Sequence, residues 1–394
     1  MLIINFSCQI WLKYYILVFM RVEKMQIADE EIILKNIDQE LIDTARVINL
    51  QKFLTPVNLQ EEGKIFVQKD GNYDPQFAYK FPEEEDIFGV IKKLEALEKR
   101  YFDSNTYTHP MAKLLEDKLK EDINKAYLLI AYIRQDRDQA NHYNKILFGD
   151  FDKTLLKKAE DIIWNYQKPD LKIRWPRLNN DEVLVYIKDY IKKKSIDNIK
   201  INHILFWNTP LMISFSKSVC YLTVPKNLVI REYDLMASLV HEIEVHHTRY
   251  VNGKKSWWNI LAHGTANYSK DEEGLAVYES RKYRRSIYPD FEQKSIYEKY
   301  ILLENGDGKS FQEMKEIALS LKIAKSNVTI FNIISRLKWG VKDTSTNTKW
   351  NNFIKSKIYL DWVDALEKRI INGWCEDDLF KWKVKIEDLP YLGW

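Results

Sequence analysis

Two histidines and two glutamates close together in the chain constrain its fold more than any other feature. His241 and Glu242 are adjacent, His246 lies five positions after His241, and Glu273 follows in the EEGLA segment. In a regular α-helix, residues five apart differ by about 140° around the axis, against about 40° for residues four apart. The HExxxH spacing therefore predicts a locally widened helix, a π-bulge, if both histidines are to face one point. The less favoured alternative is that His247 replaces His246, at about 120° on the other side.

The residue types in this window suit a catalytic zinc site. Such a site takes three protein ligands, imidazole nitrogen or carboxylate oxygen, at about 2.0–2.2 Å and keeps one position open. His241, His246 and Glu273 supply that set, and we expect one Zn²⁺ per chain. Glu242 projects to a different side of the helix, so we expect it to act as general base toward the attacking water. This division of roles is that of the HExxH metallopeptidases.

The spacing of apolar residues predicts the fold class. From about residue 27 to residue 164, apolar positions recur every three or four residues, which indicates helices. A charged stretch with Gly and Pro at 61–85 is expected to be a loop between subdomains. HILFW, LMISFS and VCYLTV read as short strands, and helical spacing returns in the HExxxH segment and in DEEGLAVYESRKYRRSIY. We predict an α+β fold, mostly α-helical, with a zincin-like core whose small β-sheet lies next to the HExxxH helix.

Three regions are expected along the chain. Residues 1–25 form an apolar extension, which the mature protein lacks if Met20 or Met25 is the true start. Residues 26–180 form a helical N-terminal region, and residues 181–394 form the catalytic region with a helical C-terminal part.

Charge and cysteine content exclude several classes of protein. The formal charge is only +3, from 60 basic and 57 acidic residues, so no strong field favours nucleic acid as a partner. Three widely spaced cysteines fit neither a disulfide framework nor a cysteine zinc knuckle, and they favour a reducing compartment. The apolar N-terminal segment lacks a basic n-region and a small-residue cleavage site. We expect a cytoplasmic protein without stable membrane association.

The segments HEIEVHHTR and DEEGLAVY resemble the DUF1704 family, whose bacterial members are called QEGLA-motif proteins and whose eukaryotic members are tyrosine carboxypeptidases acting on tubulin. FGDFDKTLLKKAEDII and YLTVPKNLVI are similar to family segments as well, so the resemblance covers most of the chain. It implies a single-zinc metallopeptidase that removes a C-terminal aromatic residue, such as tyrosine, from a protein or peptide with a free C-terminus.

By position, the resemblance implies roles for four residues: His241 and His246 as the histidine ligands, Glu273 as the third ligand and Glu242 as the catalytic glutamate. Two positions differ from the family pattern. Glu272 stands where the name motif has Gln, a mild change because that side chain should point away from zinc. Glu244 stands where Gly is expected, so we expect it to add negative charge near the site and to affect the helix distortion and substrate choice.

A carboxypeptidase must also bind the free carboxylate of its substrate, which a guanidinium does well through two parallel hydrogen bonds. Arg249, just past His246, is the nearest candidate, although charge compensation at a helix C-terminus explains it equally well. Lys226 and Arg281 are weaker candidates. Either Tyr278 or Tyr283 is expected to donate a hydrogen bond to the oxyanion.

Other chemically distinctive residues in this window have less specific roles. His263 and His247 are expected outside the ligand set, since three ligands complete the protein's share of the site. The pair Trp257 and Trp258 either lines a substrate cleft or packs. Two other functions fit the same motif, a non-catalytic regulatory protein that binds zinc and a metalloendopeptidase that cuts inside long peptides.

Overall fold

The structure is a computed structural model that describes residues 30–104, 109–166, 175–204, 211–216, 219–226, 228–324, 326–345 and 353–392. The apolar extension expected at residues 1–25 lies outside these ranges.

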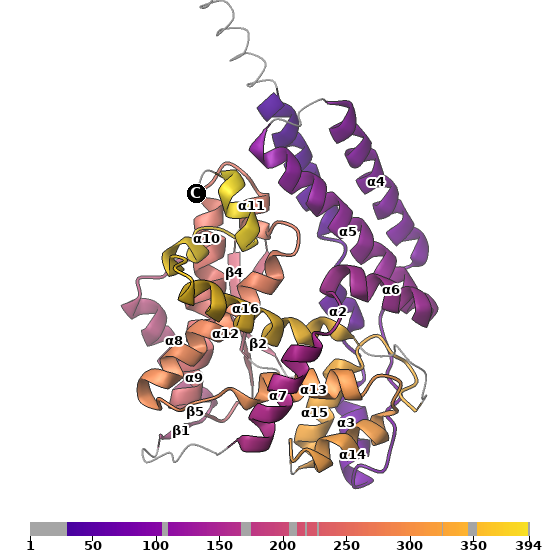
Figure 1. Cartoon of the computed structure of the whole chain (residues 1–394), viewed down its shortest axis with the longest axis vertical. Helices are drawn as coiled ribbons and strands as arrows, with labels where there is room; N and C mark the ends of the chain where they lie inside the picture. Colours follow the sequence, from indigo (N-terminus) through magenta and orange to yellow (C-terminus); the bar gives the residue numbers. More distant parts are fainter. Residues whose placement is uncertain are drawn as a thin grey trace, which may run out of the picture.

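Helices form the first part of the described chain, as the apolar periodicity predicts. Residues 30–45 are helical, and they are followed by α2 (Leu50–Leu54), α3 (Leu59–Gln68), α4 (Glu84–Asp103), α5 (Pro110–Arg134), α6 (Arg137–Phe148) and α7 (Lys153–Asn165). The long helices α4 and α5 lie side by side (Figure 1) because α4 buries Ile87, Ile91 and Leu94, one helical turn apart, in the core that it shares with α5. At the start of α5, the His109 side chain accepts a hydrogen bond from the Met111 N–H.

The prediction of a loop at residues 61–85 is wrong for the first part of that range, because α3 extends to Gln68. Its Phe66 is fully buried, with its ring 5.2 Å from that of Phe311 and 5.6 Å from that of Phe331. Those two residues belong to helices near the other end of the chain. The charged and polar residues of this segment lie on the exposed side of an amphipathic helix. Composition alone did not distinguish such a helix from a loop.

Three short strands form the main sheet. The strands β2 (Ile199–Ile204), β3 (Met212–Ser216) and β4 (Val219–Pro225) are arranged in the order β2-β4-β3, with β4 parallel to β2 and antiparallel to β3. All three were expected, but β2 begins earlier than HILFW. A separate two-stranded ladder joins β1 (Arg177–Leu178) to β5 (Ile230–Arg231). Strand β3 is an edge strand of its sheet.

Helices pack on this sheet and lead into the motif. Residues from α8 (Asn180–Lys193), from β4 and from α9 (Glu232–Leu239) share one core: Val183, Ile187, Leu222, Val224, Leu235 and Leu239. The chain then passes directly from α9 into a π-helix, η1 (Val240–His247), and on into α10 (Thr248–Lys254) and the short α11 (Ile260–His263).

The remaining described chain is helical. It comprises α12 (Tyr268–Ile287), α13 (Lys294–Asn305), α14 (Phe311–Ser320), α15 (Asn327–Leu337) and α16 (Ile358–Ile371), with 3₁₀ turns η2 (Ile354–Lys357), η3 (Glu376–Phe380) and η4 (Ile386–Leu392). Helices α12 and α16 pack together near the middle of the molecule (Figure 1). The glycine of the EEGLA segment allows this contact, because a Cβ on Gly274 would lie 2.8 Å from Trp362 Cβ and 3.0 Å from its carbonyl carbon.

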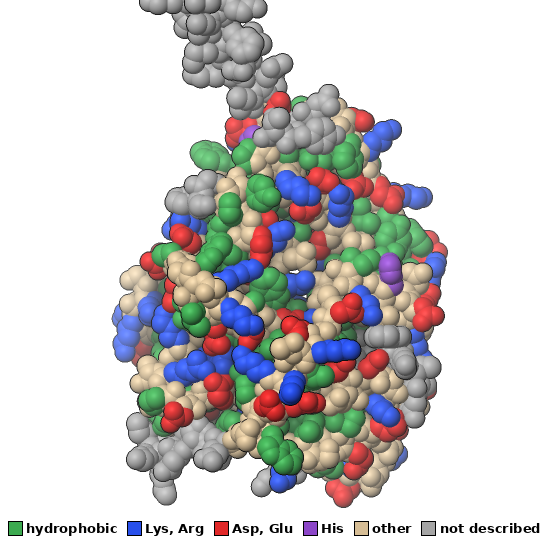
Figure 2. Space-filling view, in the orientation of Figure 1, with side chains coloured by type: hydrophobic (Ala, Val, Ile, Leu, Met, Phe, Trp, Pro, Cys, Tyr) green, Lys and Arg blue, Asp and Glu red, His purple; other side chains and the backbone are tan. Residues whose placement is uncertain are grey.

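The fold is mostly helical with small sheets, in agreement with the α+β class predicted from the sequence. The zincin-like core and the boundary near residue 180 stay predictions. Acidic and basic side chains are interspersed over the face shown in Figure 2, as their near balance in the sequence suggests. Within the described ranges, no helix combines the length and apolarity needed to cross a bilayer.

Candidate metal centre

The widened helix predicted from the histidine spacing is present. Residues Val240–His247 form a π-helix between α9 and α10. Backbone hydrogen bonds in a π-helix join residues five apart, so such residues lie one above the other on the same face. His241 and His246 therefore point to one side, with ring centroids 4.9 Å apart. The structure favours His246 over His247 as the second histidine of the cluster.

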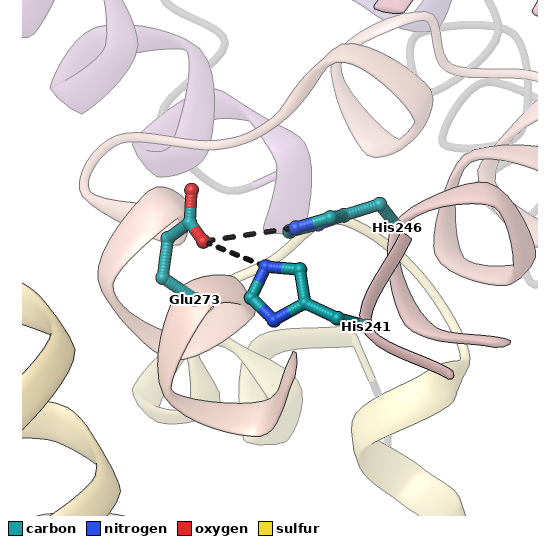
Figure 3. Close-up of side chains that lie close together, drawn as sticks. All are labelled: His241, His246 and Glu273. Carbon is teal, nitrogen blue, oxygen red and sulfur yellow. Dashed lines mark ion pairs between the residues drawn. The ribbon is translucent and has the colours of Figure 1, made fainter. Parts of the chain in front are cut away.

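His241, His246 and Glu273 converge from two elements (Figure 3), the histidines from η1 and the glutamate from α12. Glu273 Oε2 lies 3.5 Å from His241 Nε2 and 3.6 Å from His246 Nε2, and one ligand atom from each residue lies within 4.8 Å of the others. A tetrahedral ion with ligands at about 2.0–2.2 Å separates those ligands by about 3.3–3.6 Å. Both separations between Glu273 and the histidines fall within that range.

The Glu273 carboxylate fits a cation. Its Oε2 atom is buried and has no hydrogen-bond partner within the described part of the chain. Burial favours the neutral acid, but interactions with His241 and His246 outweigh this and hold the pKa of Glu273 well below its usual value. A buried, ionised oxygen facing two imidazole nitrogens is a donor set that could hold a metal ion.

Glu272, for which the sequence suggested no role at the site, orients one of the two histidines. Its carboxylate does not face the point where His241, His246 and Glu273 converge. Instead, its Oε1 lies behind the His246 ring and accepts hydrogen bonds from His246 Nδ1 and Lys383 Nζ, both at 2.6 Å. This bond places a proton on Nδ1 and leaves Nε2 facing Glu273. Burial disfavours the imidazolium, but the hydrogen bond with Glu272 and the nearby charge of Glu273 raise the pKa of His246 to about 10. A metal ion would displace the second proton.

Glu242 borders the same site on the side of the sheet. Its Oε2 accepts a hydrogen bond of 2.8 Å from the backbone N–H of Ile213 in edge strand β3, and its Oε1 lies 3.9 Å from His241 Nε2. Burial is the main reason that the pKa of Glu242 is raised. The carboxylate is thus held beside the cluster without joining it.

Glu244 does not add charge at the site, contrary to our expectation. Its carboxylate accepts a hydrogen bond from the Tyr190 hydroxyl and lies 2.6 Å from Lys194 Nζ, on the side of η1 that faces α8. The π-helix turns this position away from His241 and His246. The charge of Glu244 is instead paired with Lys194.

The cluster opens onto a cavity of about 660 Å³. Its walls come from elements far apart in the sequence, including β3, α12, α13, α15 and α16. Two tyrosines, Tyr268 and Tyr359, line it. No local motif in the sequence indicated either of them, because both are brought in by packing between helices.

Arg249 is not placed to bind a substrate carboxylate. Its side chain is only 2% exposed and donates hydrogen bonds to the carbonyl oxygens of Trp382 and Val384, with one nitrogen 3.6 Å from Glu272. It does not line the cavity. The expectation is corrected because Arg249 lies beyond the π-helix and points into the C-terminal segment, where it holds backbone carbonyls.

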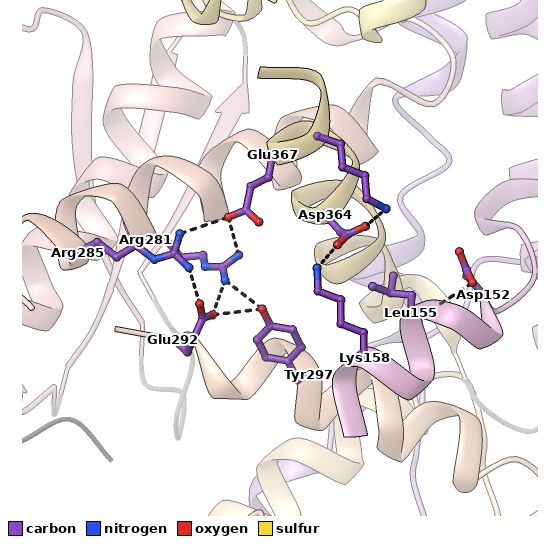
Figure 4. Close-up of polar contacts among 10 residues, drawn as sticks. Asp152, Leu155, Lys158, Arg281, Arg285, Glu292, Tyr297, Asp364 and Glu367 are labelled. Carbon is purple, nitrogen blue, oxygen red and sulfur yellow. Dashed lines mark hydrogen bonds and ion pairs between the residues drawn. The ribbon is translucent and has the colours of Figure 1, made fainter. Parts of the chain in front are cut away.

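Arg281 likewise bonds to residues away from the cavity (Figure 4). It is 2% exposed and bonds to Glu292, to the Tyr297 hydroxyl at 3.0 Å and to Glu367 at 3.2 Å. These contacts join α12 to α13 and α16, and Arg281 is not among the residues that line the cavity. The role expected of Arg281 in substrate binding is corrected to a structural one.

The other three substrate-binding candidates also lie away from the cavity lining. Lys226 is exposed just beyond β4. Tyr278 packs among apolar residues of two cores, and the ring of Tyr283 lies 6.1 Å from that of Tyr233. Their helical spacing after Glu273 points them outward from the cluster, so neither tyrosine is placed to stabilise an oxyanion.

The remaining histidines and the tryptophan pair lie outside the cluster, as expected for His247 and His263. His247 is buried with a lowered pKa, and His263 packs 5.8 Å from the Tyr250 ring. Trp258 packs against the N-terminal core, whereas Trp257 is 85% exposed, and neither lines the cavity.

Comparison with known families matches residues 64–281 to the microtubule-associated tyrosine carboxypeptidase family. The matched segment contains η1 and the part of α12 that carries Glu272 and Glu273. No curated protein sequence matches the chain.

Proposed function

Because the chain belongs to the microtubule-associated tyrosine carboxypeptidase family, we propose that it is a zinc-dependent carboxypeptidase that removes the C-terminal residue of a protein or peptide. The observation that carries this proposal is the convergence of His241, His246 and Glu273 within reach of one metal ion, beside the buried Glu242 and on the wall of one cavity. The family description supports tyrosine as the residue released.

His241 Nε2, His246 Nε2 and Glu273 Oε2 would hold the ion. When bound, zinc supplies Lewis-acid polarisation of the scissile carbonyl and lowers the pKa of water. Glu272 keeps the His246 ring in the tautomer that presents Nε2, and Lys383 and Arg249 balance the charge of Glu272.

Glu242 acts as the general base. It takes a proton from the attacking water as the oxygen bonds to the carbonyl carbon, and it passes that proton to the amide nitrogen as the C–N bond breaks. The raised pKa of Glu242, which burial causes, suits a group that must hold this proton between the two steps. The hydrogen bond from the Ile213 N–H fixes one oxygen and orients the other toward the cavity.

Tyr359 takes the place that we expected for Tyr278 or Tyr283. It lines the cavity from α16 and interacts with Glu273. A phenolic O–H next to the cluster can donate to the oxygen of the tetrahedral intermediate, where one such donor typically contributes about 10²–10³ in kcat.

The experiment compares two glutamates of the same π-helix. Purified wild type should contain about one zinc per chain and release C-terminal residues from a set of peptides that differ only at the last position. Glu242→Gln should abolish release and retain zinc. Glu244→Gln, which removes an equal charge two residues away on the side that faces Tyr190, should leave the rate within about threefold of wild type.

Mass spectrometry of the products separates this proposal from its competitors. A zinc-loaded wild type that is inert on every peptide would contradict it and favour a regulatory protein. Fragments from cuts inside long peptides, with intact C-termini, would indicate an endopeptidase.

A further inference from the structure

Two of the cations that line the cavity, Lys299 and Arg336, have no part in the proposed mechanism and lie close enough to interact with each other. Lys299 lies on α13 and Arg336 on α15, and both side chains line the cavity that contains Glu273. Both are partly buried. They lie outside the segment that matches the family, so the match assigns them no role.

Neither cation has a carboxylate within 4.0 Å among the residues that the structure describes. The acid next to Lys299, Glu298, instead pairs with Lys294 at 2.7 Å. Three other cations line the cavity. Arg284 lies 2.6 Å from Asp234 and Lys383 lies 2.6 Å from Glu272, whereas Lys355 in η2 has no carboxylate within 4.0 Å in the described ranges.

The two charges also interact with each other. Burial lowers the pKa of Lys299 to about 8 and the charge of Arg336 adds to this effect, while the charges of Glu298 and Glu273 oppose it only in part. Burial likewise lowers the pKa of Arg336. Unpaired charges of one sign in a partly desolvated wall are unfavourable, and a bound anion removes that penalty.

A third donor lies on the same wall. The indole Nε1–H of Trp339 is buried without a hydrogen-bond acceptor in the described ranges. Buried donors are nearly always satisfied in folded proteins, so an unmatched one in the lining of the same cavity is consistent with an acceptor supplied by a ligand.

Tyr359 links this wall to the metal cluster. Lys299 Nζ lies 6.0 Å from the centroid of the Tyr359 ring, and Tyr359 interacts with both Arg336 and Glu273. An anion bound between the two cations would therefore lie near the cluster.

We propose that Arg336 and Lys299 bind the C-terminal α-carboxylate of the peptide substrate and thereby make the site an exopeptidase site. This inference rests on the proposed function. Arg336 offers a planar fork that matches a carboxylate, and Lys299 adds a point charge. We thus assign to Lys299 and Arg336 the carboxylate-binding role that the sequence suggested for Arg249.

The test measures binding rather than turnover. The full chain with Glu242→Gln, loaded with zinc, is titrated into a fluorescent peptide that ends in tyrosine, prepared as the free acid and as the C-terminal amide. Both peptides carry one internal glutamate, so a side-chain carboxylate is present in each. We expect the free acid to bind at least about 30-fold more tightly than the amide. Adding Arg336→Gln or Lys299→Met should bring this ratio close to one.

Two further variants allow the carboxylate site to be tested even if one of these substitutions disturbs folding. Arg336→Lys keeps the charge but not the fork, so an intermediate ratio is expected. Arg284→Gln removes a cavity guanidinium that is already paired with Asp234, and it should keep the full ratio. An unchanged preference for the free acid in the Lys299→Met, Arg336→Gln double variant overturns the inference, as does equal binding of both peptides by the starting protein.

These outcomes are distinct from failure of the proposed function. A wild type that releases C-terminal residues while the double variant still prefers the free acid refutes only the carboxylate site. A wild type that cleaves nothing while the preference depends on Arg336 refutes the peptidase and supports the carboxylate site.

Discussion

At the scale of single residues, Glu272 shows how a neighbour of the cluster controls it. Its carboxylate is buried and bonded to His246 and Lys383, and although burial opposes ionisation, these contacts and Arg249 lower its pKa to about 2. It is therefore an anion that fixes the orientation of His246. Gln, which the family name motif has here, would keep an acceptor for Nδ1–H but would not balance the charge of Lys383.

We predict that the acceptor at position 272 matters for metal affinity. Glu272→Leu should weaken zinc binding by about 10–100-fold, because His246 loses the bond that sets its tautomer, and Glu272→Gln should have a smaller effect. Competition with a chelator of known affinity measures both. Asp271→Asn is the control, since Asp271 accepts from the Ile386 N–H and contacts neither histidine. Equal zinc affinity in all three variants would contradict the role of Glu272.

The sequence predicted some residues of this site well and others poorly. His241, Glu242, His246 and Glu273 were found because they lie on two helices close together in the chain and leave a recognisable spacing. Lys299, Arg336 and Tyr359 left none, since α13, α15 and α16 reach the cavity only through tertiary packing. Arg249 was misassigned for a related reason, because its partners are backbone carbonyls at the far end of the chain.

At the scale of elements, the π-helix is held by cores on two sides. Ile243 is buried in the core that contains the sheet, and Val245 in the core between α12 and α16. A regular helix would rotate one of these residues, and one histidine, away from its position. The histidine spacing was enough to predict the widening, whereas the apolar partners that stabilise it became visible only in the fold.

Close contact between α10 and α11 supports the helix that continues from the π-helix. A Cβ on Gly253 would lie 2.2 Å from Leu261 O and 2.5 Å from Ala262 Cα, and both are backbone atoms that cannot move aside cheaply. We predict that Gly253→Ala lowers the free energy of unfolding by about 1–3 kcal/mol, measured by chemical denaturation.

A second glycine provides the matched control. Gly89 lies within α4, and a Cβ there would meet nothing within 4 Å. Gly89→Ala should therefore raise the free energy of unfolding by about 0.5–1 kcal/mol, because alanine favours the helix. Destabilisation of similar size in both variants would mean that the contact with α11 is not what excludes a side chain at position 253.

At the scale of the whole molecule, a buried carboxylate links the helix at residues 30–45 to the start of α11. Asp38 is 1% exposed and accepts hydrogen bonds from the backbone N–H groups of Asn259 and Ile260, at the start of α11. Burial raises its pKa to about 6, although these hydrogen bonds oppose the shift. The helical segment and the strands were predictable from periodicity, but this contact between distant segments was not, since no local pattern pairs Asp38 with α11.

The raised pKa of Asp38 predicts a pH dependence of stability. Between about pH 4 and pH 6 the folded protein holds a proton that the unfolded chain releases, so the free energy of unfolding falls as pH rises, by up to about 3 kcal/mol. Asp38→Asn cannot titrate and should lack this component. Urea unfolding of both proteins at pH 4.5 and 7.5 measures the difference between them. Parallel changes in wild type and variant would show that Asp38 is ionised throughout.

The distribution of cores also predicts what metal removal does. Separate hydrophobic cores, one centred on α4 and α5, one on the sheet and one on α3, α14 and α15, surround the cluster without including its ligands. Chelation should therefore leave the far-UV circular dichroism unchanged, since folding does not depend on the ion. Zinc should still raise the melting temperature, because at a free concentration of 100 times Kd it adds about 2.7 kcal/mol to the folded state. His241→Ala should show no such shift. Loss of helical signal on chelation would instead make the metal structural, as in the regulatory alternative, and would weaken the case for an open catalytic position.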